Sequence, residues 1–264
     1  MQPKVSIIVC CFNEEENILF RTLQSIKTQD YENTEVFVID DSGEEKFKTL
    51  VQKNFPSFSY VPSVFQNNAM ALNLGLFLST GNYVAILDGD DEWIHPRKIT
   101  LQVHFLENNK TYSAIGTGIE IQYPDGRKTT PDFSQKEDIS RKLLLESPIC
   151  HSSVLIKSIS LKSVMKKNSH MSIFGAYDPV LKRGKDWDLL LSLGIFGKLG
   201  IIPEICTRYY QNQSGKRWYD SWNGIRTVLK HRKNYPYWMR AFFIQVSRFI
   251  IFFILEKMFK YKRV

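Results

Sequence analysis

Residues 81–91 read Gly-Asn-Tyr-Val-Ala-Ile-Leu-Asp-Gly-Asp-Asp, an apolar run that leads directly into a cluster of acidic residues. The run Tyr83–Leu87 is too short for a membrane span, and it has the composition of a strand that is covered on both faces. Two earlier runs are similar, because Val5–Cys11 leads into a polar segment and Glu35–Ile39 leads to Asp40-Asp41-Ser42. Open α/β sheets bind their ligands at the carboxyl ends of such strands.

Helical patterns alternate with these strands. Leu19, Leu23 and Ile26 share one helix face, and Asn13 is expected to cap this helix, followed by three glutamates at the positive end of its dipole. Further along, the pattern predicts a helix over Asn68–Ser79, a helix after Pro96, a hairpin around Tyr123–Arg127, a strand within Ser147–Lys157, a helix over Gly184–Leu193 and a strand over Leu199–Ile205. We therefore expect an α/β catalytic domain over residues 1–215, with a mostly parallel central sheet and flanking helices.

Positive charge is concentrated at the carboxyl end. The chain has 264 residues and a formal net charge of +8, and residues 216–264 contain 12 of its 35 Lys and Arg but only 2 of its 27 Asp and Glu. This tail is the part expected to meet an anionic partner.

The four cysteines form no C-x-x-C pair, which argues against structural zinc and favours a reducing compartment. Cys10 and Cys11 are expected to point to opposite faces of the first strand.

The tail is rich in apolar and aromatic residues. Ala241–Leu255 contains only three polar residues, one of them Arg248, and a basic segment closes the chain. A spanning helix needs about 20 apolar residues, and an arginine at mid-span costs about 2.5–3.5 kcal/mol. Residues 216–264 are therefore expected to form a helical extension that lies on an anionic membrane surface. Nucleic acid is not an expected partner, because long apolar runs interrupt the positive charge. Without a recognisable signal peptide, the expected location is cytoplasmic, peripheral at the inner face of the plasma membrane.

The Asp88-Gly-Asp-Asp91 cluster is the strongest chemical signal. Mg²⁺ and Mn²⁺ prefer oxygen ligands, and one or two carboxylates suffice when a nucleotide diphosphate and water fill the other positions. Asp88, Asp90 and Asp91 are therefore candidate metal ligands, and Gly89 is expected to let the backbone approach the ligand closely. Taken alone, the cluster is equally compatible with a turn that carries solvated charges. Its place at the end of an apolar strand favours the metal site.

Two further acidic positions fit the same chemistry. The carboxylate of Asp41 can accept a hydrogen bond from N3–H of uracil, and Phe12 can stack on the ring, although Asp41 equally suits a cap for the following helix. Asp186 is the candidate general base, because a carboxylate is the usual group that takes the proton of an acceptor hydroxyl when a sugar centre is inverted. Its alternative role is to stabilise the dipole of the helix in whose first turn it lies.

Several motifs occur in an order that resembles family-two glycosyltransferases, over about residues 3–210. They are Val5-Ser-Ile-Ile-Val-Cys-Cys-Phe-Asn-Glu14, Val38-Ile-Asp-Asp-Ser42, Asn73-Leu-Gly75, the stretch 81–91 and Asp186-Trp-Asp-Leu189. The resemblance implies a GT-A fold, an inverting single displacement, and a UDP-sugar as donor, as in enzymes that build bacterial surface polysaccharides. It would place Phe12, Asp41, Asn73 and Asp88 at the donor nucleotide, Asp88, Asp90 and Asp91 at a Mn²⁺ or Mg²⁺ ion, and Asp186 as the base.

Some residues depart from the family pattern or occupy less specific positions. Phe12 stands where Tyr is common, Leu72 where an Arg usually precedes Asn73, and Lys185 where a Glu often precedes the base. These differences indicate a changed donor or acceptor preference. His151 and Trp187 are candidates for the acceptor side, and Arg208–Arg217 resembles a basic loop over the diphosphate. A lone histidine near an apolar strand is more often a core residue, and a basic loop is more often simply solvated.

Two functional hypotheses follow. In the first, the chain is a metal-dependent transferase that moves a sugar from a nucleotide diphosphate to a hydroxyl of a glycan or lipid-linked acceptor, with the tail as membrane anchor. In the second, it is a catalytically inactive nucleotide-sugar or glycan-binding scaffold with an oligomerising tail. A donor other than a UDP-sugar stays open, because the carboxylate of Asp41 also suits an N–H of guanine.

Overall fold

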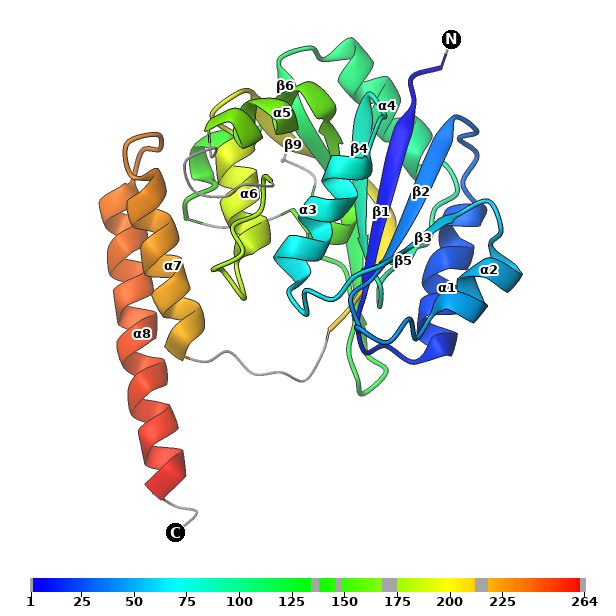
Figure 1. Ribbon diagram of the computed structural model, residues 1–264. Helices are drawn as coiled ribbons and strands as arrows, with labels where there is room; N and C mark the ends of the chain where they lie inside the picture. The colour runs from blue at the N-terminus through cyan, green and yellow to red at the C-terminus, as the bar shows by residue number, and fades with distance from the viewer. Residues whose placement is uncertain (1, 134–137, 146–148, 168–174, 212–217, 262–264) are drawn as a thin grey trace.

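The protein is described by a computed structural model that covers residues 2–133, 138–145, 149–167, 175–211 and 218–261. Its strands form one mixed sheet in the order β3-β2-β1-β4-β8-β6-β9-β5, with β7 beside β6, and helices cover both faces (Figure 1). The strands are β1 (Val5–Cys11), β2 (Thr34–Asp40), β3 (Ser59–Pro62), β4 (Tyr83–Asp88), β5 (Glu92–Trp93), β6 (Tyr112–Gln122), β7 (Lys128–Thr129), β8 (Leu155–Lys157) and β9 (Lys198–Tyr210). The helices are α1 (Glu16–Lys27), α2 (Lys48–Asn54), α3 (Asn68–Leu78), α4 (Lys98–Asn108), α5 (Ser158–Lys167), α6 (Lys185–Leu193), α7 (Trp218–His231) and α8 (Trp238–Tyr261), and a short 3-10 helix, η2, covers His151–Ser153.

The central strand β1 is buried on both faces, as its sequence, apolar apart from Ser6, predicts. It pairs in parallel with β2 on one side and with β4 on the other. Its side chains alternate between two apolar cores: Cys10 packs in the core under α3, α5 and α6, and Cys11 packs in the core under α1, α2 and α4. The predicted burial of the two cysteines on opposite faces is confirmed.

Most of the predicted elements are present, with three differences. Helix α1 begins at Glu16 after Glu15, whose side chain makes no capping bond, so the prediction that Asn13 caps it is wrong because Asn13 lies too far upstream. The final strand is longer than predicted, since β9 continues to Tyr210 alongside β6 and β5. The strand expected within Ser147–Lys157 is limited to Leu155–Lys157, because η2 precedes it.

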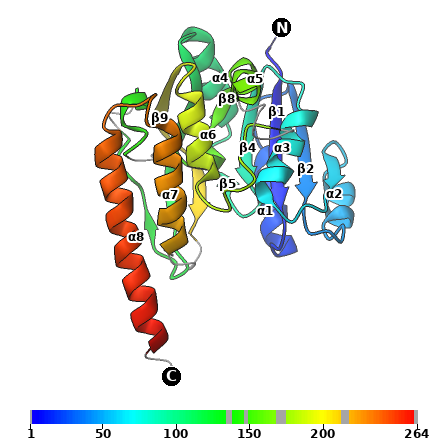
Figure 2. The same cartoon turned by 60° about the vertical axis from the view of Figure 1, so that its left-hand side comes forward.

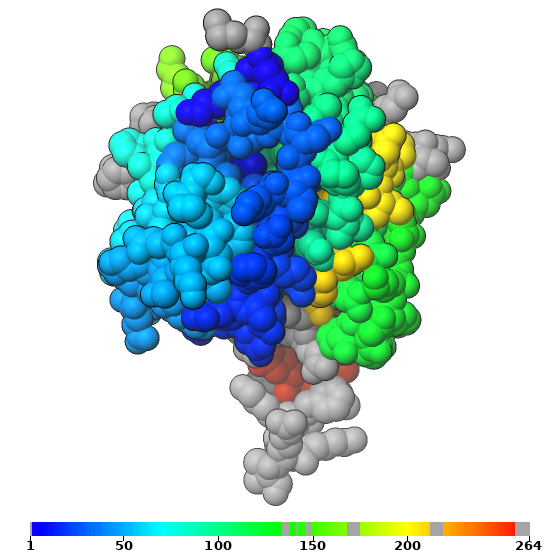
Figure 3. Space-filling view, turned by 90° about the vertical axis from the view of Figure 1, so that its right-hand side faces the viewer, coloured from blue at the N-terminus to red at the C-terminus, as the bar shows by residue number. Residues whose placement is uncertain are grey.

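The tail forms a helical hairpin that packs against α6. Val228 of α7, Tyr235 in the turn and Ala241 at the start of α8 are buried in the same core as the four leucines at the end of α6. Figure 2 shows α7 between α6 and α8. On the far side of the molecule, α1 and α2 form a continuous surface, and only the distal end of α8 is visible below it (Figure 3). Within the described part of the chain, Trp238–Glu256 is the one helical stretch long and apolar enough to cross a membrane.

Glu35 links the start of the sheet to the turn before β4. Its carboxylate accepts hydrogen bonds from the hydroxyl of Ser6 (2.6 Å) and from the backbone N–H of Thr80 (2.7 Å), and it forms an ion pair with Lys4 (2.6 Å). Burial tends to raise the pKa of this carboxyl group, but the bonds from Lys4, Ser6 and Thr80 lower it to about 2. The charged form of Glu35 therefore stabilises the fold.

We predict that Glu35→Gln lowers the free energy of unfolding at pH 7 by about 1–3 kcal/mol, because hydrogen bonds to a charged group are lost. Since the folded pKa of about 2 lies below the unfolded value near 4.5, the contribution is present above pH 4.5 and disappears as the pH falls toward 2. Urea unfolding of both proteins across this range measures it, with the exposed Glu32→Gln as control. A difference of the same size at pH 2.5 and pH 7 would show that the charge is not responsible.

Candidate functional site

Three strand ends and the start of α6 meet at one edge of the sheet. The parallel register places Asp40 beside Cys11 and Asp88 beside Cys10, and the backbone N–H of Asp41 donates to the carbonyl of Cys11 (2.8 Å). Burial raises the pKa of the Cys10 thiol, and the charges of Asp88, Lys185 and Asp41 also act on it. Side chains from β4, α6 and the segment after β2 therefore lie near the carboxyl end of β1.

The Asp88–Asp91 turn is held against β1 and α1. The hydroxyl of Thr22 lies within hydrogen-bonding distance of the carbonyl oxygens of Gly89 (2.9 Å) and Asp91 (2.7 Å), and Arg21 donates to the carbonyl of Asp90 (2.9 Å). A Cβ atom at Gly89 would lie 2.9 Å from the carbonyl oxygen of Cys10. The close neighbour of this glycine is thus the backbone of β1, whereas the sequence had suggested a ligand.

The three carboxylates of this turn have different surroundings. Asp91 is fully buried, where it accepts hydrogen bonds from the Ser152 hydroxyl and from the backbone N–H of Tyr210. Burial, followed by the charges of Asp88 and Asp90, raises its pKa. The side chain of Asp88 is 33% exposed, and Asp90 is partly exposed. Of the three candidate metal ligands, Asp88 and Asp90 are therefore the two that a ligand can reach.

A histidine and a tyrosine extend the site from Asp88. His151 Nδ1 lies 3.1 and 3.2 Å from the two carboxylate oxygens of Asp88, and His151 Nε2 lies 2.8 Å from the hydroxyl of Tyr177. Burial alone would raise the pKa of Asp88, but the charge and hydrogen bond of His151, with Lys185 and Ser152, lower it to about 2. His151, predicted for the acceptor side, thus contacts Asp88 directly. Tyr177 was missed, because no sequence motif marks it.

Asp41 and Phe12 flank the same edge. Asp41 is 3% exposed, and its Oδ1 accepts from the Ser63 hydroxyl (2.6 Å) and the Gln66 N–H (3.0 Å), while Oδ2 accepts from the Asn67 N–H (2.7 Å). A carboxylate oxygen accepts about two hydrogen bonds, so Oδ2 has capacity for one more donor. The ring of Phe12 is 42% exposed. The neighbouring Asp40 accepts from the backbone N–H of Phe47 (3.0 Å), the residue before α2, and no described side chain caps the start of that helix.

Helix α6 carries acidic residues with opposite surroundings. It begins after Gly184, whose positive φ of 79° favours glycine. Asp186 in the first turn is partly exposed, and its charge adds to the effect of burial in raising the pKa of Tyr177 and Cys150. Asp188 is fully buried against the tail. Trp187, the other acceptor-side candidate, donates its indole N–H to the carbonyl of Leu143 (2.6 Å), so its polar group points into the protein.

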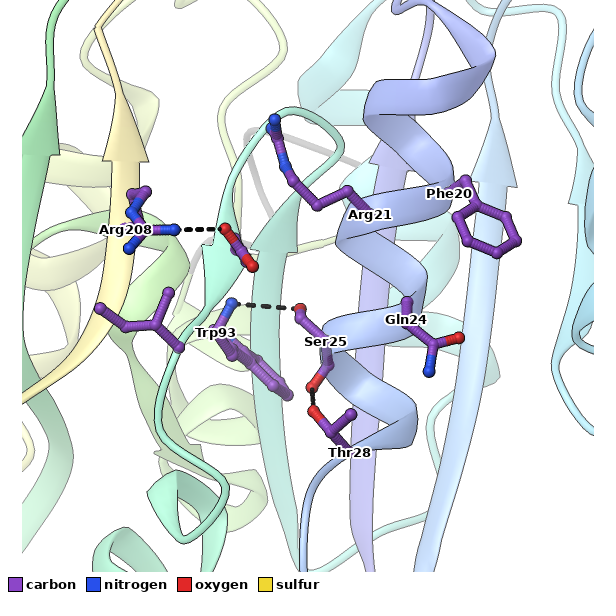
Figure 4. A pocket seen from close by; sticks show the side chains of 9 residues that line it. Phe20, Arg21, Gln24, Ser25, Thr28, Trp93 and Arg208 are labelled. Carbon is purple, nitrogen blue, oxygen red and sulfur yellow. Dashed lines mark hydrogen bonds and ion pairs between the residues drawn. The ribbon is translucent and has the colours of Figure 1, made fainter. Parts of the chain in front are cut away.

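A separate cavity of about 600 Å³ lies between α1, β5 and β9. Figure 4 shows Phe20, Arg21, Gln24 and Thr28 on its α1 side and Arg208 opposite. Arg208, predicted to begin a basic loop over the diphosphate, is paired with Glu92 (2.9 Å) and Glu120 (2.6 Å). Residues 208–210 of that predicted loop belong to β9 instead, because β9 continues alongside β6, and residues 212–217 lie outside the described residues. Asp88, Asp90 and Asp91 are not among the residues that line this cavity.

Comparison with known proteins decides the family. The sequence signature of "Glycosyl transferase family 2" matches residues 6–163, more than half of the chain. The chain belongs to glycosyl transferase family 2. The prediction that it is a glycosyltransferase of this family is confirmed. The match ends before α6, so Asp186 and the tail lie beyond it.

Relatives of this family cover different parts of the chain. EpsE of Bacillus subtilis is 28% identical over 171 residues, which are 61% of this chain and 59% of EpsE. The Escherichia coli UDP-Glc:alpha-D-GlcNAc-diphosphoundecaprenol beta-1,3-glucosyltransferase WfaP is 33% identical over 110 residues, 41% of this chain and 43% of WfaP. The chain thus spans less than two thirds of either relative.

The crystal structure of S. aureus TarS in complex with UDP-GlcNAc has a TM-score of 0.66 at 15% identity, covering 94% of this chain and 71% of TarS. This likeness confirms the predicted GT-A-like fold.

Asn73, expected at the donor nucleotide, is 1% exposed. Its side-chain oxygen accepts from the backbone N–H of Tyr177 (3.0 Å), and its amide donates to the Tyr177 carbonyl (2.9 Å). Asn73 therefore joins α3 to the segment that presents the Tyr177 hydroxyl to His151. The neighbouring Leu72, in the position of the usual arginine, is fully buried in the core.

We predict that Asn73→Ala lowers the free energy of unfolding by about 1–3 kcal/mol, because it leaves the buried N–H and carbonyl of Tyr177 without partners. UDP affinity of the folded variant should change little. Denaturant unfolding and calorimetric titration with UDP measure the two effects, and the exposed Asn68→Ala in the same helix is the control. Unchanged stability combined with lost UDP binding would instead make Asn73 a nucleotide contact.

Proposed function

We propose that this glycosyltransferase moves a sugar from a UDP-sugar to a hydroxyl of a glycan or lipid-linked acceptor, with inversion and with Asp186 as the general base. The observation that carries the proposal is the convergence of Asp41, Asp88 and the start of α6 around the carboxyl end of β1. In open α/β sheets this edge is the usual ligand site.

The donor assignment rests on the edge formed by β1 and β2. Oδ2 of Asp41 has capacity for one further donor, which suits the single N3–H of uracil, and the exposed ring of Phe12 supplies a stacking surface. TarS, which shares the fold, has been crystallised with UDP and with UDP-GlcNAc. These points favour uracil over guanine.

The exposed carboxylates suit a divalent cation. Asp88, whose low pKa keeps it ionised, and Asp90 would hold Mn²⁺ or Mg²⁺. No group of three His, Cys, Asp or Glu side chains able to hold a metal occurs among the described residues, so the remaining ligands of such an ion would have to come from a diphosphate and water. Such an ion would stabilise the charge of the leaving diphosphate.

The chemical step then needs one general base, which takes the proton from the hydroxyl of the substrate that receives the sugar. The acceptor oxygen forms a bond to the anomeric carbon while the bond from that carbon to the diphosphate oxygen breaks. The hydroxyl proton passes to the carboxylate of Asp186, and UDP leaves with the bonding electrons. Asp186 lies at the start of α6, close enough to Tyr177 for its charge to act on that hydroxyl. His151 contacts Asp88, and Tyr177 contacts His151 in turn.

We predict that Asp186→Asn lowers kcat for sugar transfer by about 10²–10⁴-fold, because the general base is lost, while UDP affinity is retained. Turnover is measured over a panel of nucleotide sugars with a polyprenyl-diphosphate-linked sugar as acceptor. Chelation with EDTA should abolish it, and added Mn²⁺ should restore it. The exposed hairpin variant Asp125→Asn is the control. Full activity of Asp186→Asn, or turnover that is insensitive to EDTA, would refute the proposed roles.

We also propose that α8 places the enzyme on the cytoplasmic face of an anionic membrane. Its exposed apolar side chains include Phe243, Ile250 and Ile254, and basic residues follow in the sequence. α7 lies alongside, with Trp222 beside Phe249 (ring centroids 6.0 Å apart). Because α7 carries several charged residues, a spanning α8 would draw them into the bilayer at high cost. A helix lying in the interface avoids this cost. WfaP, by its name, acts on a sugar linked through diphosphate to undecaprenol, and a long apolar chain of this kind partitions into a membrane.

We predict that the triple variant Phe243→Glu, Ile250→Glu, Ile254→Glu no longer sediments with vesicles containing phosphatidylglycerol, whereas the wild type does. Three buried apolar contacts with the bilayer are replaced by repulsion from its anionic surface. Phe77→Glu on α3, at a position more exposed than any of the three, is the control. Equal sedimentation of wild type and triple variant would contradict the membrane role of α8. Substitutions are preferable to truncation at residue 215, because α7 contributes to the core.

A further inference from the structure

The buried residue Asp188 connects the catalytic helix to the tail. Its carboxylate is fully buried, with Lys230 Nζ 2.7 Å from Oδ2 and His231 Nε2 2.8 Å from Oδ1. Both partners belong to the last turn of α7. Burial tends to raise the pKa of Asp188, but these two residues lower it overall, so the carboxylate is ionised and depends on the tail for its compensation.

Lys230 also reaches the segment that carries Tyr177. Its Nζ lies 3.9 Å from Oδ2 of Asp178, the residue after Tyr177. One ammonium group therefore contacts both the helix that bears Asp186 and the segment whose tyrosine binds His151. Both segments follow β4 in the sequence, and both contribute side chains to the site at the carboxyl end of β1.

Two further contacts fix α6 at its ends. Before its start, Arg183 forms an ion pair with Asp220 of α7 (3.2 Å). At its end, the Tyr235 hydroxyl donates to the carbonyl of Leu191 (2.5 Å), and a Cβ atom at Gly194 would lie 2.3 Å from that hydroxyl. The hairpin thus contacts α6 at its start, middle and end, and every one of these contacts comes from residues 220–235.

We propose that Lys230 and His231 are positioning residues of the transfer reaction, which act through Asp188 and Asp178 to hold Asp186 and Tyr177 in their places. This inference rests on the proposed function of Asp186. Asp186 precedes Asp188 by two residues in the same helical turn, so a shift of α6 at Asp188 moves the base directly. A displacement of about 1 Å in a reacting group is enough to lower a rate by about 10²-fold.

The donor edge has no direct bond to Lys230 among the described residues; its link to the segment that Lys230 holds is the side chain of Asn67, which donates to the carbonyl of Pro179 (3.1 Å). Phe12 and Asp41 are held by β1, β2 and the segment before α3, and within the described part of the chain the tail makes no hydrogen bond to either residue. Loss of Lys230 should therefore lower kcat and leave the KM for the donor nearly unchanged. The tail hairpin, which carries the exposed apolar surface of α8, would in this way also support the catalytic base.

The test compares Lys230→Met, Lys230→Arg and Lys233→Met in the full chain. Lys230→Met is expected to lower kcat by about 10–100-fold with a donor KM within about threefold of wild type. Lys230→Arg should recover most of the activity, since its guanidinium can pair with both carboxylates. Lys233, three residues on, is exposed, and Lys233→Met should match wild type. An unchanged kcat in folded Lys230→Met, or an equal loss in Lys233→Met, would overturn the proposal.

Amide hydrogen exchange separates this inference from the proposed function. In Lys230→Met, exchange should become faster in residues 185–188 and 175–178 and stay unchanged in β1 and β2, whether or not a substrate is known. If Asp186→Asn kept full activity, the proposed function would fail. The exchange experiment would still test whether the contacts of Lys230 and His231 with Asp188 and Asp178 hold α6 and the Tyr177 segment in place. Should Lys230→Met not fold, Tyr235→Phe tests the same attachment of the tail to α6 at Leu191, and it is expected to give a smaller loss of kcat with unchanged KM. No change in exchange or in kcat in that variant would likewise refute the proposal.

Discussion

The parallel pairing of β1 with β2 on one side and β4 on the other is the constraint on which the site depends. Because these strands run in the same direction and in register, their carboxyl ends deliver Asp40 and Asp88 beside Cys11 and Cys10. The sheet can hold this register only because β1 is apolar on both faces and packs in two cores. The cost of gathering several carboxylates at one edge is offset by donors around them, from Ser63 and Asn67 at Asp41 to Ser152 and Tyr210 at Asp91.

Burial divides the acidic residues into two kinds. Asp40, Asp41, Asp91 and Asp188 are buried, and their carboxylates bind groups of the protein, although Oδ2 of Asp41 keeps capacity for one more donor. Asp88, Asp90 and Asp186 retain exposed surface. A single motif thus supplies one residue of each kind, as the pairs Asp90 and Asp91 or Asp186 and Asp188 show. The buried member fixes the turn or helix, and the exposed member is then available to a ligand.

The sequence was sufficient for the elements that form the edge of the site, and insufficient for the contacts between distant segments. The apolar runs and the acidic residues after them predicted β1, β2 and β4, because a strand buried on both faces has an unmistakable composition. Nothing in the sequence marked Tyr177 or the partners of Asp188, since a contact between α6 and α7 joins residues more than 40 positions apart. The start of α1 was missed because Glu15, a residue without a capping side chain, precedes it. The same long-range packing gives Asn73 its contact with Tyr177, which a local motif cannot reveal.

Diffraction from crystals grown with UDP and Mn²⁺ tests the central claim most directly, because the anomalous signal of manganese locates the ion independently of any assumed site. The account predicts a manganese peak beside the carboxylates of Asp88 and Asp90. It also predicts uracil on the ring of Phe12 with N3 facing Asp41, and a diphosphate that lies between the uracil and Asp186. A metal ion or nucleotide bound away from the carboxyl end of β1, for instance in the cavity lined by Arg21 and Arg208, would contradict it.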